Sequence, residues 1–152
     1  LAVADTDLST VAMAAVDLLR PLAVEKEIAL HTSMAAAPTV GDVDRLQQVA
    51  VNLLTNAIKF TPHGGTVAVR TGIENGRAVL EVSDSGPGIP AGELERVFER
   101  FWRGTNAAGA AGSGIGLAVV KELVDAHHGA VRASNGAGRG ATFVVSLPGR
   151  IG

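Results

Sequence analysis

The sequence predicts a single α/β domain, because helical and extended apolar patterns alternate along its 152 residues without an internal repeat or an obvious boundary. Three segments place apolar residues at spacings of three and four, as amphipathic helices do. Several shorter segments alternate apolar and polar residues, as half-buried strands do. A chain of this length buries a core of its own, so one domain is expected over residues 1–152.

The first part of the chain predicts two helices separated by a strand. Asp7 or Ser9 provides a helix cap, and Pro21 predicts that this first helix kinks or ends nearby. Residues 28–33 alternate as a short strand. Asp42 then caps a second amphipathic helix, which ends at a turn rich in proline and glycine.

The rest of the chain predicts two strand hairpins and two further helices. Asn75-Gly76 is the dipeptide expected at the first hairpin turn. Residues 104–113 are small and polar, which predicts a flexible loop, and loops of that length inside a domain are usually functional or disordered. The predicted elements are strands at 66–71, 78–83, 130–134 and 141–147, a short helix at 93–98 and a long helix at 115–127.

Composition excludes several functional classes. A net charge of −2 and scattered basic residues give no attraction to nucleic acid or anionic membrane. The absence of cysteine excludes disulfides, thiolate zinc sites and cysteine nucleophiles. No apolar run is long enough to span a bilayer, so we expect a soluble chain, and the absence of cysteine fits a cytoplasmic one. The start at Leu1 suggests a piece of a longer protein. No Ser-His-acid arrangement is evident, and His31, His63, His127 and His128 are interpreted as structural or solvated.

One predicted helical face combines two amides and an ammonium group. Asn52, Asn56 and Lys59 are spaced so that they share the side of the second helix opposite Leu53 and Leu54. An asparagine oxygen is a neutral, hard ligand for Mg²⁺, which completes its shell with water and substrate phosphates. A lysine supplies a point charge to those phosphates. The pattern indicates a metal-triphosphate site, although a solvated polar face would show the same residues.

A single carboxylate, Asp84, leaves an apolar strand into a turn that contains Gly86 and Gly88. Glycines let a flat base approach the backbone. An ionised carboxylate accepts a hydrogen bond from the exocyclic amine of adenine, where guanine carries a carbonyl. The pattern therefore favours ATP over GTP, and its alternative is an Asx turn in which Asp84 bonds only its own backbone.

A glycine loop at Gly112, Gly114 and Gly116 opens the third long helix. Backbone N–H groups and the positive end of a helix favour phosphate there. The loop lacks the Gly-Lys-Ser/Thr of a Walker motif and follows no strand, so neither that motif nor a dinucleotide fingerprint applies. A linker that ends in a helix would look the same. The aromatic cluster within residues 98–102 fits an anchor for this loop, a docking surface or ordinary core.

Taken in order, these motifs resemble the catalytic and ATP-binding domain of bacterial sensor histidine kinases, within the GHKL ATPase superfamily. The resemblance covers nearly the whole chain. Five segments of the chain resemble five conserved motifs of this family. Residues 44–62 resemble the N box, 84–90 the G1 box, 98–103 the F box, 112–117 the G2 box and 138–143 the final glycine-threonine element.

The resemblance implies the Bergerat fold, an α/β (α+β) two-layer sandwich in which three helices cover one face of a mixed, mostly antiparallel sheet. It implies ATP and Mg²⁺ as cofactors, with Asn56 as the metal ligand and residues 103–113 as an ATP lid. It implies that Asp84 reads the adenine amine, supported by Thr142. The implied nucleotide-binding residues are Asn52, Asn56, Lys59, Phe60, Asp84, Gly86, Gly88, Ile89, Arg103, Gly112, Ser113, Gly114, Ile115, Gly116, Leu117 and Thr142.

The implied activity is that of a protein-histidine kinase in two-component signalling. No histidine here precedes an acidic residue, as the family's phosphoacceptor does, so we expect the acceptor on an upstream dimerisation domain. This chain alone should then hold no catalytic residue of its own, should not phosphorylate itself and, without that domain, should be monomeric. The expected partners are that dimerisation domain and a response regulator, and family habit places the parent protein in the membrane with this domain on the cytoplasmic side.

Two alternatives belong to other classes. A gyrase-like or Hsp90-like ATPase carries a glutamate as the base for water on the N-box helix, whereas Asn52 stands at the matching position and cannot take a proton. A degenerate nucleotide-binding or docking module would have lost its site residues. The intact Asn56, Lys59 and Asp84 argue against that alternative.

Overall fold

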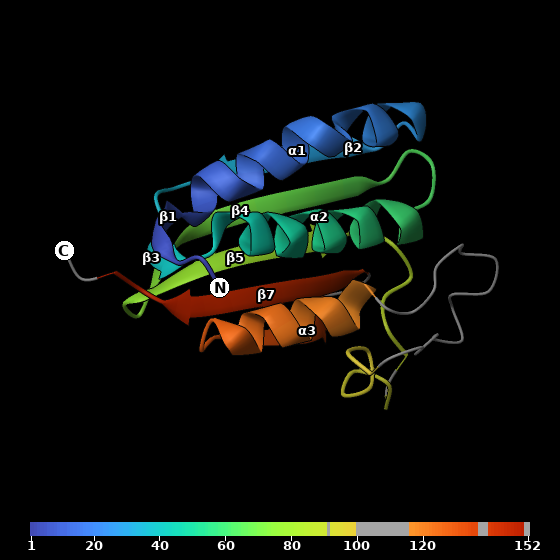
Figure 1. Ribbon diagram of the computed structural model, residues 1–152. Coiled ribbons are helices and arrows are strands. Elements are labelled where there is room, and N and C mark those ends of the chain that lie inside the picture. The colour runs from blue at the N-terminus through green and yellow to red at the C-terminus, as the bar shows by residue number, and fades with distance from the viewer. Residues whose placement is uncertain (91, 100–115, 137–139, 151–152) are drawn as a thin grey trace.

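The computed structural model describes residues 1–90, 92–99, 116–136 and 140–150 (Figure 1). Within them, three helices lie on one face of a five-stranded sheet, and a two-stranded sheet lies at one end. The helices are α1 (Leu8–Glu25), α2 (Val43–Phe60) and α3 (Gly116–Ala126). The strands are β1 (Ala4–Asp7), β2 (Ala29–Met34), β3 (Pro38–Gly41), β4 (Thr66–Glu74), β5 (Arg77–Asp84), β6 (Ala130–Asn135) and β7 (Ala141–Pro148). The predicted fold class is confirmed.

The large sheet has the strand order β2-β4-β5-β7-β6. Strand β2 runs parallel to β4, and the other neighbouring pairs are antiparallel, so the sheet is mixed as expected. Strand β5 ends at Asp84 where β7 begins, and Ser83 is paired with Thr142. The end of β5, the start of β7, the C-terminus of α2 and the N-terminus of α3 therefore meet at one end of the sandwich (Figure 1).

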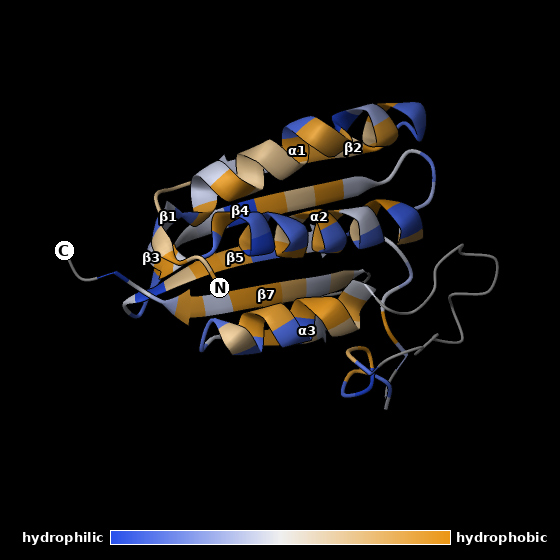
Figure 2. Ribbon diagram, viewed as in Figure 1, coloured by the Kyte–Doolittle hydropathy of each residue, from blue (hydrophilic) through white to orange (hydrophobic). Residues whose placement is uncertain are grey.

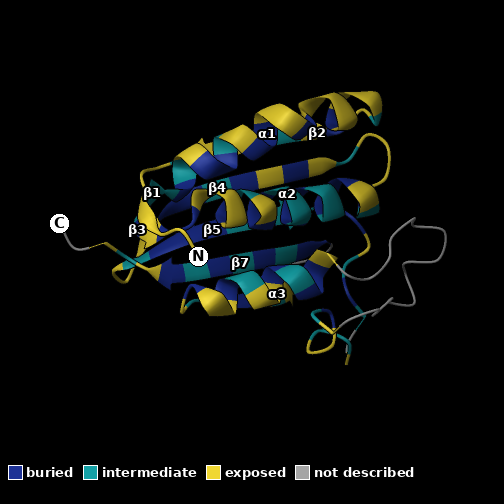
Figure 3. Ribbon diagram, viewed as in Figure 1, coloured by how far each residue is buried: buried dark blue, intermediate teal, exposed yellow. Residues whose placement is uncertain are grey.

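The core lies between the helices and the sheet. Helix α1 packs over β2, β4 and β5, α2 lies against β5, and α3 covers β6. Figure 2 shows the central strands mostly in hydrophobic colours, whereas α2 alternates apolar and polar residues around its axis. Figure 3 shows exposed residues on the outer sides of the helices and buried ones along the strands. The largest fully buried side chains are Leu8, Leu46, Leu53, Leu54, Leu80 and Leu147.

Most predicted elements are present. The structure differs from the predictions at residues 93–98 and at the end of α1, and it contains a further sheet. Residues 93–98 form successive turns rather than a helix, because the backbone N–H groups of Arg96 and Glu99 bond carbonyls three residues back. Helix α1 continues past Pro21 to Glu25. Proline has no N–H to donate to the carbonyl of Asp17, but Asp17 and Pro21 are both exposed, so the helix continues on a side that is open to solvent.

The sequence patterns missed the two-stranded sheet. Strands β1 and β3 are four residues each, too short for a visible alternation, and they pair antiparallel across α1 and β2. No helix of the described residues is long and apolar enough to cross a membrane.

Candidate functional site

The polar residues singled out in the sequence gather at the end of the sandwich where α2 finishes. Along α2, Asn52 and Asn56 are half-buried and Lys59 is exposed. The Asn52 side-chain nitrogen donates a hydrogen bond to the carbonyl of Gly116, 3.2 Å away, at the first residue of α3. This contact joins the amide-bearing face of α2 to the helix that follows the glycine loop.

The C-terminus of α2 is held by residues outside the predicted site. The Lys26 ammonium, from the segment after α1, donates hydrogen bonds to the carbonyls of Ile58 and Lys59, both at 2.9 Å. The Thr61 backbone N–H and hydroxyl both donate to the carbonyl of Ala57. These donors satisfy carbonyls that a helix end leaves unpaired, and they fix the last turn of α2, which carries Asn56 and Lys59.

Asp84, at the end of β5, is half-buried and uses one of its carboxylate oxygens locally. Oδ1 accepts hydrogen bonds from the backbone N–H groups of Gly86 (2.9 Å) and Ala141 (3.3 Å). Among the described residues no donor to Oδ2 is found. Burial raises the pKa of Asp84, and the two N–H donors oppose that rise. The hydrogen bond of the Asx alternative, from the Gly86 N–H to Asp84 Oδ1, is therefore present, and it leaves Oδ2 available to a ligand.

Close backbone approaches set the shape around Asp84. A β-carbon at Gly86 would lie 2.6 Å from the Phe60 carbonyl oxygen, so the loop after β5 touches the end of α2. A β-carbon at Gly140 would overlap the carbonyl oxygen of Asp84 itself. Gly140 also has a φ of +91°, which favours glycine. Only glycine at these positions lets the three segments meet.

Thr142, on β7, is paired with Ser83, the residue before Asp84 on β5. Its hydroxyl is 3.1 Å from the hydroxyl of Ser83, directly across the β5–β7 pair. The next residue of β7 is Phe143, whose ring meets the ring of Phe98 edge-on with centroids 6.1 Å apart, so Phe98 packs against the core.

The remaining site predictions divide into two groups. Ile89 and Leu117 are buried, Phe60 is half-buried, and Gly116 is exposed at the start of α3. The predicted residues that lie outside the described part of the chain are Arg103, Gly112, Ser113, Gly114 and Ile115, together with the rest of the 103–113 lid.

The histidines do not form a second site. His127 is buried; its Nε2 accepts a hydrogen bond from the Asp42 backbone N–H (3.0 Å), which leaves the proton on Nδ1 to donate to the Leu123 carbonyl (2.7 Å). His31, His63 and His128 are exposed. The described residues contain no cluster of three histidine or acidic side chains placed to hold a metal. A metal at Asn56 would therefore take most of its ligands from water and phosphate.

Comparison with known proteins gives one consistent relationship. Residues 41–151 match the family described as histidine kinase-, DNA gyrase B-, and HSP90-like ATPase. The chain is 38% identical over 138 residues to the circadian input-output histidine kinase CikA of Thermosynechococcus vestitus, covering 87% of this chain and 19% of that protein. It is 44% identical over 129 residues to the signal transduction histidine-protein kinase/phosphatase MprB of Mycobacterium sp. strain KMS, covering 82% and 25%.

Solved structures agree. The mycobacterial sensor histidine kinase MprB superposes with a TM-score of 0.87 at 36% identity over 97% of this chain and 99% of that chain. Full-length ShkA in complex with AMPPNP superposes with a TM-score of 0.87 at 31% identity, over 100% of this chain and 32% of that chain. The chain spans about a fifth to a quarter of the curated relatives named above.

Proposed function

Because the chain belongs to the histidine kinase-, DNA gyrase B-, and HSP90-like ATPase family, as the ATP-binding domain of a bacterial sensor histidine kinase, we propose that it binds Mg-ATP and donates the γ-phosphoryl group to a histidine on a separate dimerisation domain. The phosphoryl group then passes to a response regulator. The protein that contains this domain is proposed to be a membrane receptor, with the domain on the cytoplasmic side.

The observation that carries the proposal is the state of Asp84. Two backbone N–H groups donate to Oδ1 and so orient the carboxylate, and Oδ2 remains for a ligand. An adenine amine donates to that oxygen, whereas a guanine carbonyl would face it as a second acceptor. The glycines at 86 and 140 let neighbouring backbone segments pack closely around Asp84, which keeps its position fixed. This arrangement supports adenine recognition.

The triphosphate is proposed to lie along α2. The Asn56 side-chain oxygen would hold Mg²⁺, which offsets charge on the phosphates, and Lys59 would contact the phosphates directly. The end of α2 that carries both residues is fixed by Lys26 and Thr61. Asn52 is already bonded to Gly116 and, as an amide, has no basicity to activate water. This favours transfer to a protein over hydrolysis.

The proposed reaction is an in-line displacement. A histidine nitrogen forms a bond to the γ-phosphorus, the bond from that phosphorus to the bridging oxygen breaks, and ADP leaves. The described residues contribute binding and orientation to this step. His127 has both ring nitrogens engaged inside the fold, so it is a poor acceptor, in keeping with an acceptor on another domain.

Calorimetric titration of the purified chain with Mg-ATP and, in parallel, Mg-GTP tests the proposal. We expect saturable binding of ATP, weak or no binding of GTP, and no phosphorylation of the chain. Equal binding of both nucleotides would refute the assignment of Asp84, and binding of neither would refute the proposed function for this chain.

The metal assignment needs a separate titration. Asn56→Ala should remove most of the difference between ATP affinity with and without Mg²⁺. Thr55→Ala, at a neighbouring half-buried position of α2, is the control and should keep that difference. A metal dependence unchanged in Asn56→Ala would count against Asn56 as the ligand.

A further inference from the structure

The loop from Ser85 to Ile89 leaves β5 and passes over the start of β7. Its first residue is tied to β4: the Ser85 backbone N–H donates to the Thr66 carbonyl (3.0 Å), and the Thr66 N–H donates to the Ser85 hydroxyl (2.9 Å). A β-carbon at Gly88 would lie 3.2 Å from the Gly140 carbonyl oxygen, in the turn before β7. The loop thus starts on one side of Asp84 and crosses to the other.

The far end of this loop is tied to β6 by one side chain. At the last residue of β6, Asn135 Oδ1 accepts a hydrogen bond from the Ile89 backbone N–H, and Asn135 Nδ2 donates to the Ile89 carbonyl, both at 2.7 Å. The amide side chain satisfies both backbone groups of Ile89 as a neighbouring strand would. Asn135 is 46 residues away from Ile89 in sequence.

Asparagine suits this contact because its side chain offers one acceptor and one donor at the spacing of a peptide group. Aspartate of the same shape would keep the acceptor for the N–H but would oppose the carbonyl with a second oxygen. The contact also limits Gly88, whose φ is +82° and whose β-carbon, if present, would lie 2.9 Å from Asn135 Oδ1. The amide therefore fixes two successive residues of the loop.

The side chain of Ile89 is buried in the core and would hold the loop near the domain by itself. Apolar packing, however, is not directional, so it does not set the rotation of the backbone at Ile89 and Gly88. The paired hydrogen bonds do set it. The pair therefore holds the Gly88 backbone against the Gly140 carbonyl, next to Ala141, whose N–H donates to Asp84.

We propose that Asn135 is a positioning residue for the nucleotide site, which holds the loop from Ser85 to Ile89 at the width that an adenine ring requires beside Asp84. The inference rests on the proposed function. Asn135 acts through Ile89 and Gly88 and needs no contact with the nucleotide. Both the affinity for ATP and the preference for ATP over GTP depend on it.

The test compares Asn135→Asp with the wild-type chain and with Ser134→Ala, an exposed neighbour on the same strand, as the control. At neutral pH, Asn135→Asp should weaken Mg-ATP binding about tenfold, the loss expected from one hydrogen bond replaced by an unfavourable contact, and should narrow the ratio of ATP to GTP affinity. Acidification should bring its affinity closer to that of the wild type at the same pH, because a protonated carboxyl donates to the Ile89 carbonyl as the amide does. Wild-type affinity and selectivity in Asn135→Asp would overturn the proposal.

Amide hydrogen exchange distinguishes the local anchoring of Ile89 by Asn135 from a contribution of Asn135 to the stability of the whole domain. In Asn135→Ala, the Ile89 amide should exchange at least about tenfold faster than in the wild type, while amides at the centre of β5 and β7 keep their protection. Unchanged protection at Ile89 would overturn the anchor. If the wild-type chain binds no ATP, the proposed function fails. If the wild type binds ATP and both Asn135 variants bind it as tightly as the wild type does, only the positioning role fails.

Discussion

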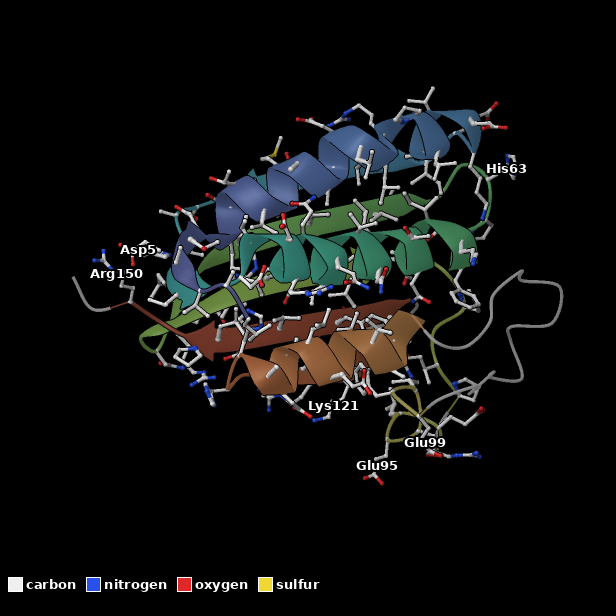
Figure 4. All side chains as sticks on the ribbon, in the orientation of Figure 1. Asp5, His63, Glu95, Glu99, Lys121 and Arg150 are labelled. Atoms are coloured by element: carbon white, nitrogen blue, oxygen red, sulfur yellow. The ribbon has the colours of Figure 1, made fainter. Side chains whose placement is uncertain are left out.

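The two ends of the sandwich use aspartate in opposite ways. Asp7 and Asp42 lie at the end where α1 and α2 begin, beside the two-stranded sheet, and Asp84 lies at the end where α2 finishes (Figure 1). Figure 4 marks these ends by the Asp5–Arg150 ion pair on one side and by His63 on the other. All three aspartates lie at or next to the end of a strand, yet only Asp84 has its pKa raised.

Asp7 and Asp42 are structural helix caps. Burial raises the pKa of Asp7, but bonds from the Ala37 N–H, the Ser9 hydroxyl and the Ser9 N–H outweigh it, and the pKa lies below 3.8. The backbone N–H groups of Ala2 and Arg45 lead the set of donors that lower the pKa of Asp42. Donors at a helix N-terminus favour a carboxylate, so these two aspartates stabilise the fold while charged.

Asp84 has two backbone donors where Asp7 and Asp42 have three donors each, and these two do not offset the effect of burial on its carboxylate, so the charge of Asp84 opposes folding rather than aiding it. A side chain that costs stability in the empty protein, and keeps one oxygen without a donor among the described residues, suits a ligand contact better than a structural role. The comparison therefore distinguishes Asp84, which we propose binds adenine, from the two aspartates that cap helices.

The largest effect that this comparison predicts is for Asp84→Asn. The amide oxygen would still accept from Gly86 and Ala141, but an NH₂ group would replace Oδ2 and face the adenine amine as a second donor. We expect ATP affinity to fall by about two orders of magnitude, the loss of a hydrogen bond to a charged group plus a donor-donor contact. The melting temperature should stay the same or rise. Calorimetry and thermal denaturation measure both, and wild-type affinity in this variant would refute the base contact.

The opposite result is expected for Asp7→Ala. This change removes the cap of α1 and the bond to Ala37, so the free energy of unfolding should fall by about 2 kcal/mol. ATP affinity of the folded chain should remain within about twofold of the wild type, because Asp7 lies at the other end of the molecule. Urea denaturation and calorimetry test this pair of outcomes. A large loss of affinity with little loss of stability would contradict the division between the two ends.

The contributions of Asp84 and Asp7 to the free energy of unfolding should also change with pH in opposite directions. The pKa of Asp84 is raised, so the wild type gains stability from this group as pH falls from neutral through that pKa, and the advantage of Asp84→Asn should shrink over the same range. The pKa of Asp7 is lowered, so its contribution is complete above 3.8 and is lost only as pH falls below that value. Urea midpoints of Asp84→Asn, Asp7→Ala and the wild type, measured from about pH 7 to pH 3, give the difference in stability between each variant and the wild type at each pH. Parallel curves would show that the two carboxylates are alike.

Local patterns predicted the long helices and the strands of the two hairpins. Periodicity identifies α2, and the asparagines and lysine on its polar face need no tertiary information. The capping roles of Asp7 and Asp42 were also visible, because a cap acts on the residues that follow it. The position of Asp84 after an apolar strand and before glycines made it a candidate, but the pattern alone also fitted the Asx turn, whose hydrogen bond to Gly86 is present.

What the patterns missed depends on contacts between distant segments. The β1–β3 pair, the bonds from Lys26 to the end of α2 and the Asn135–Ile89 pair join residues that are more than 30 positions apart. Nothing next to Asn135 in the sequence distinguishes it from an exposed turn residue. The turns at 93–98 have the composition of a short helix, and packing of Val97 and Phe98 into the core overrides that local preference.

The smallest predicted effect concerns Lys26, which holds the C-terminus of α2 at the end of the sandwich where Asp84 lies. Lys26→Met keeps the apolar stem of the side chain and removes the donors to the Ile58 and Lys59 carbonyls. The last turn of α2 should then fray, which lowers the free energy of unfolding by about 1 kcal/mol and weakens Mg-ATP binding about threefold, because Asn56 and Lys59 lose their fixed position. Lys121→Met removes the exposed Lys121–Asp125 ion pair on α3 and is the control; it should change neither quantity appreciably (Figure 4). If Lys26→Met loses stability and keeps full affinity, the end of α2 is a structural cap like those of Asp7 and Asp42. If affinity falls while Lys121→Met is unaffected, the α2 terminus supports the site as well as the fold.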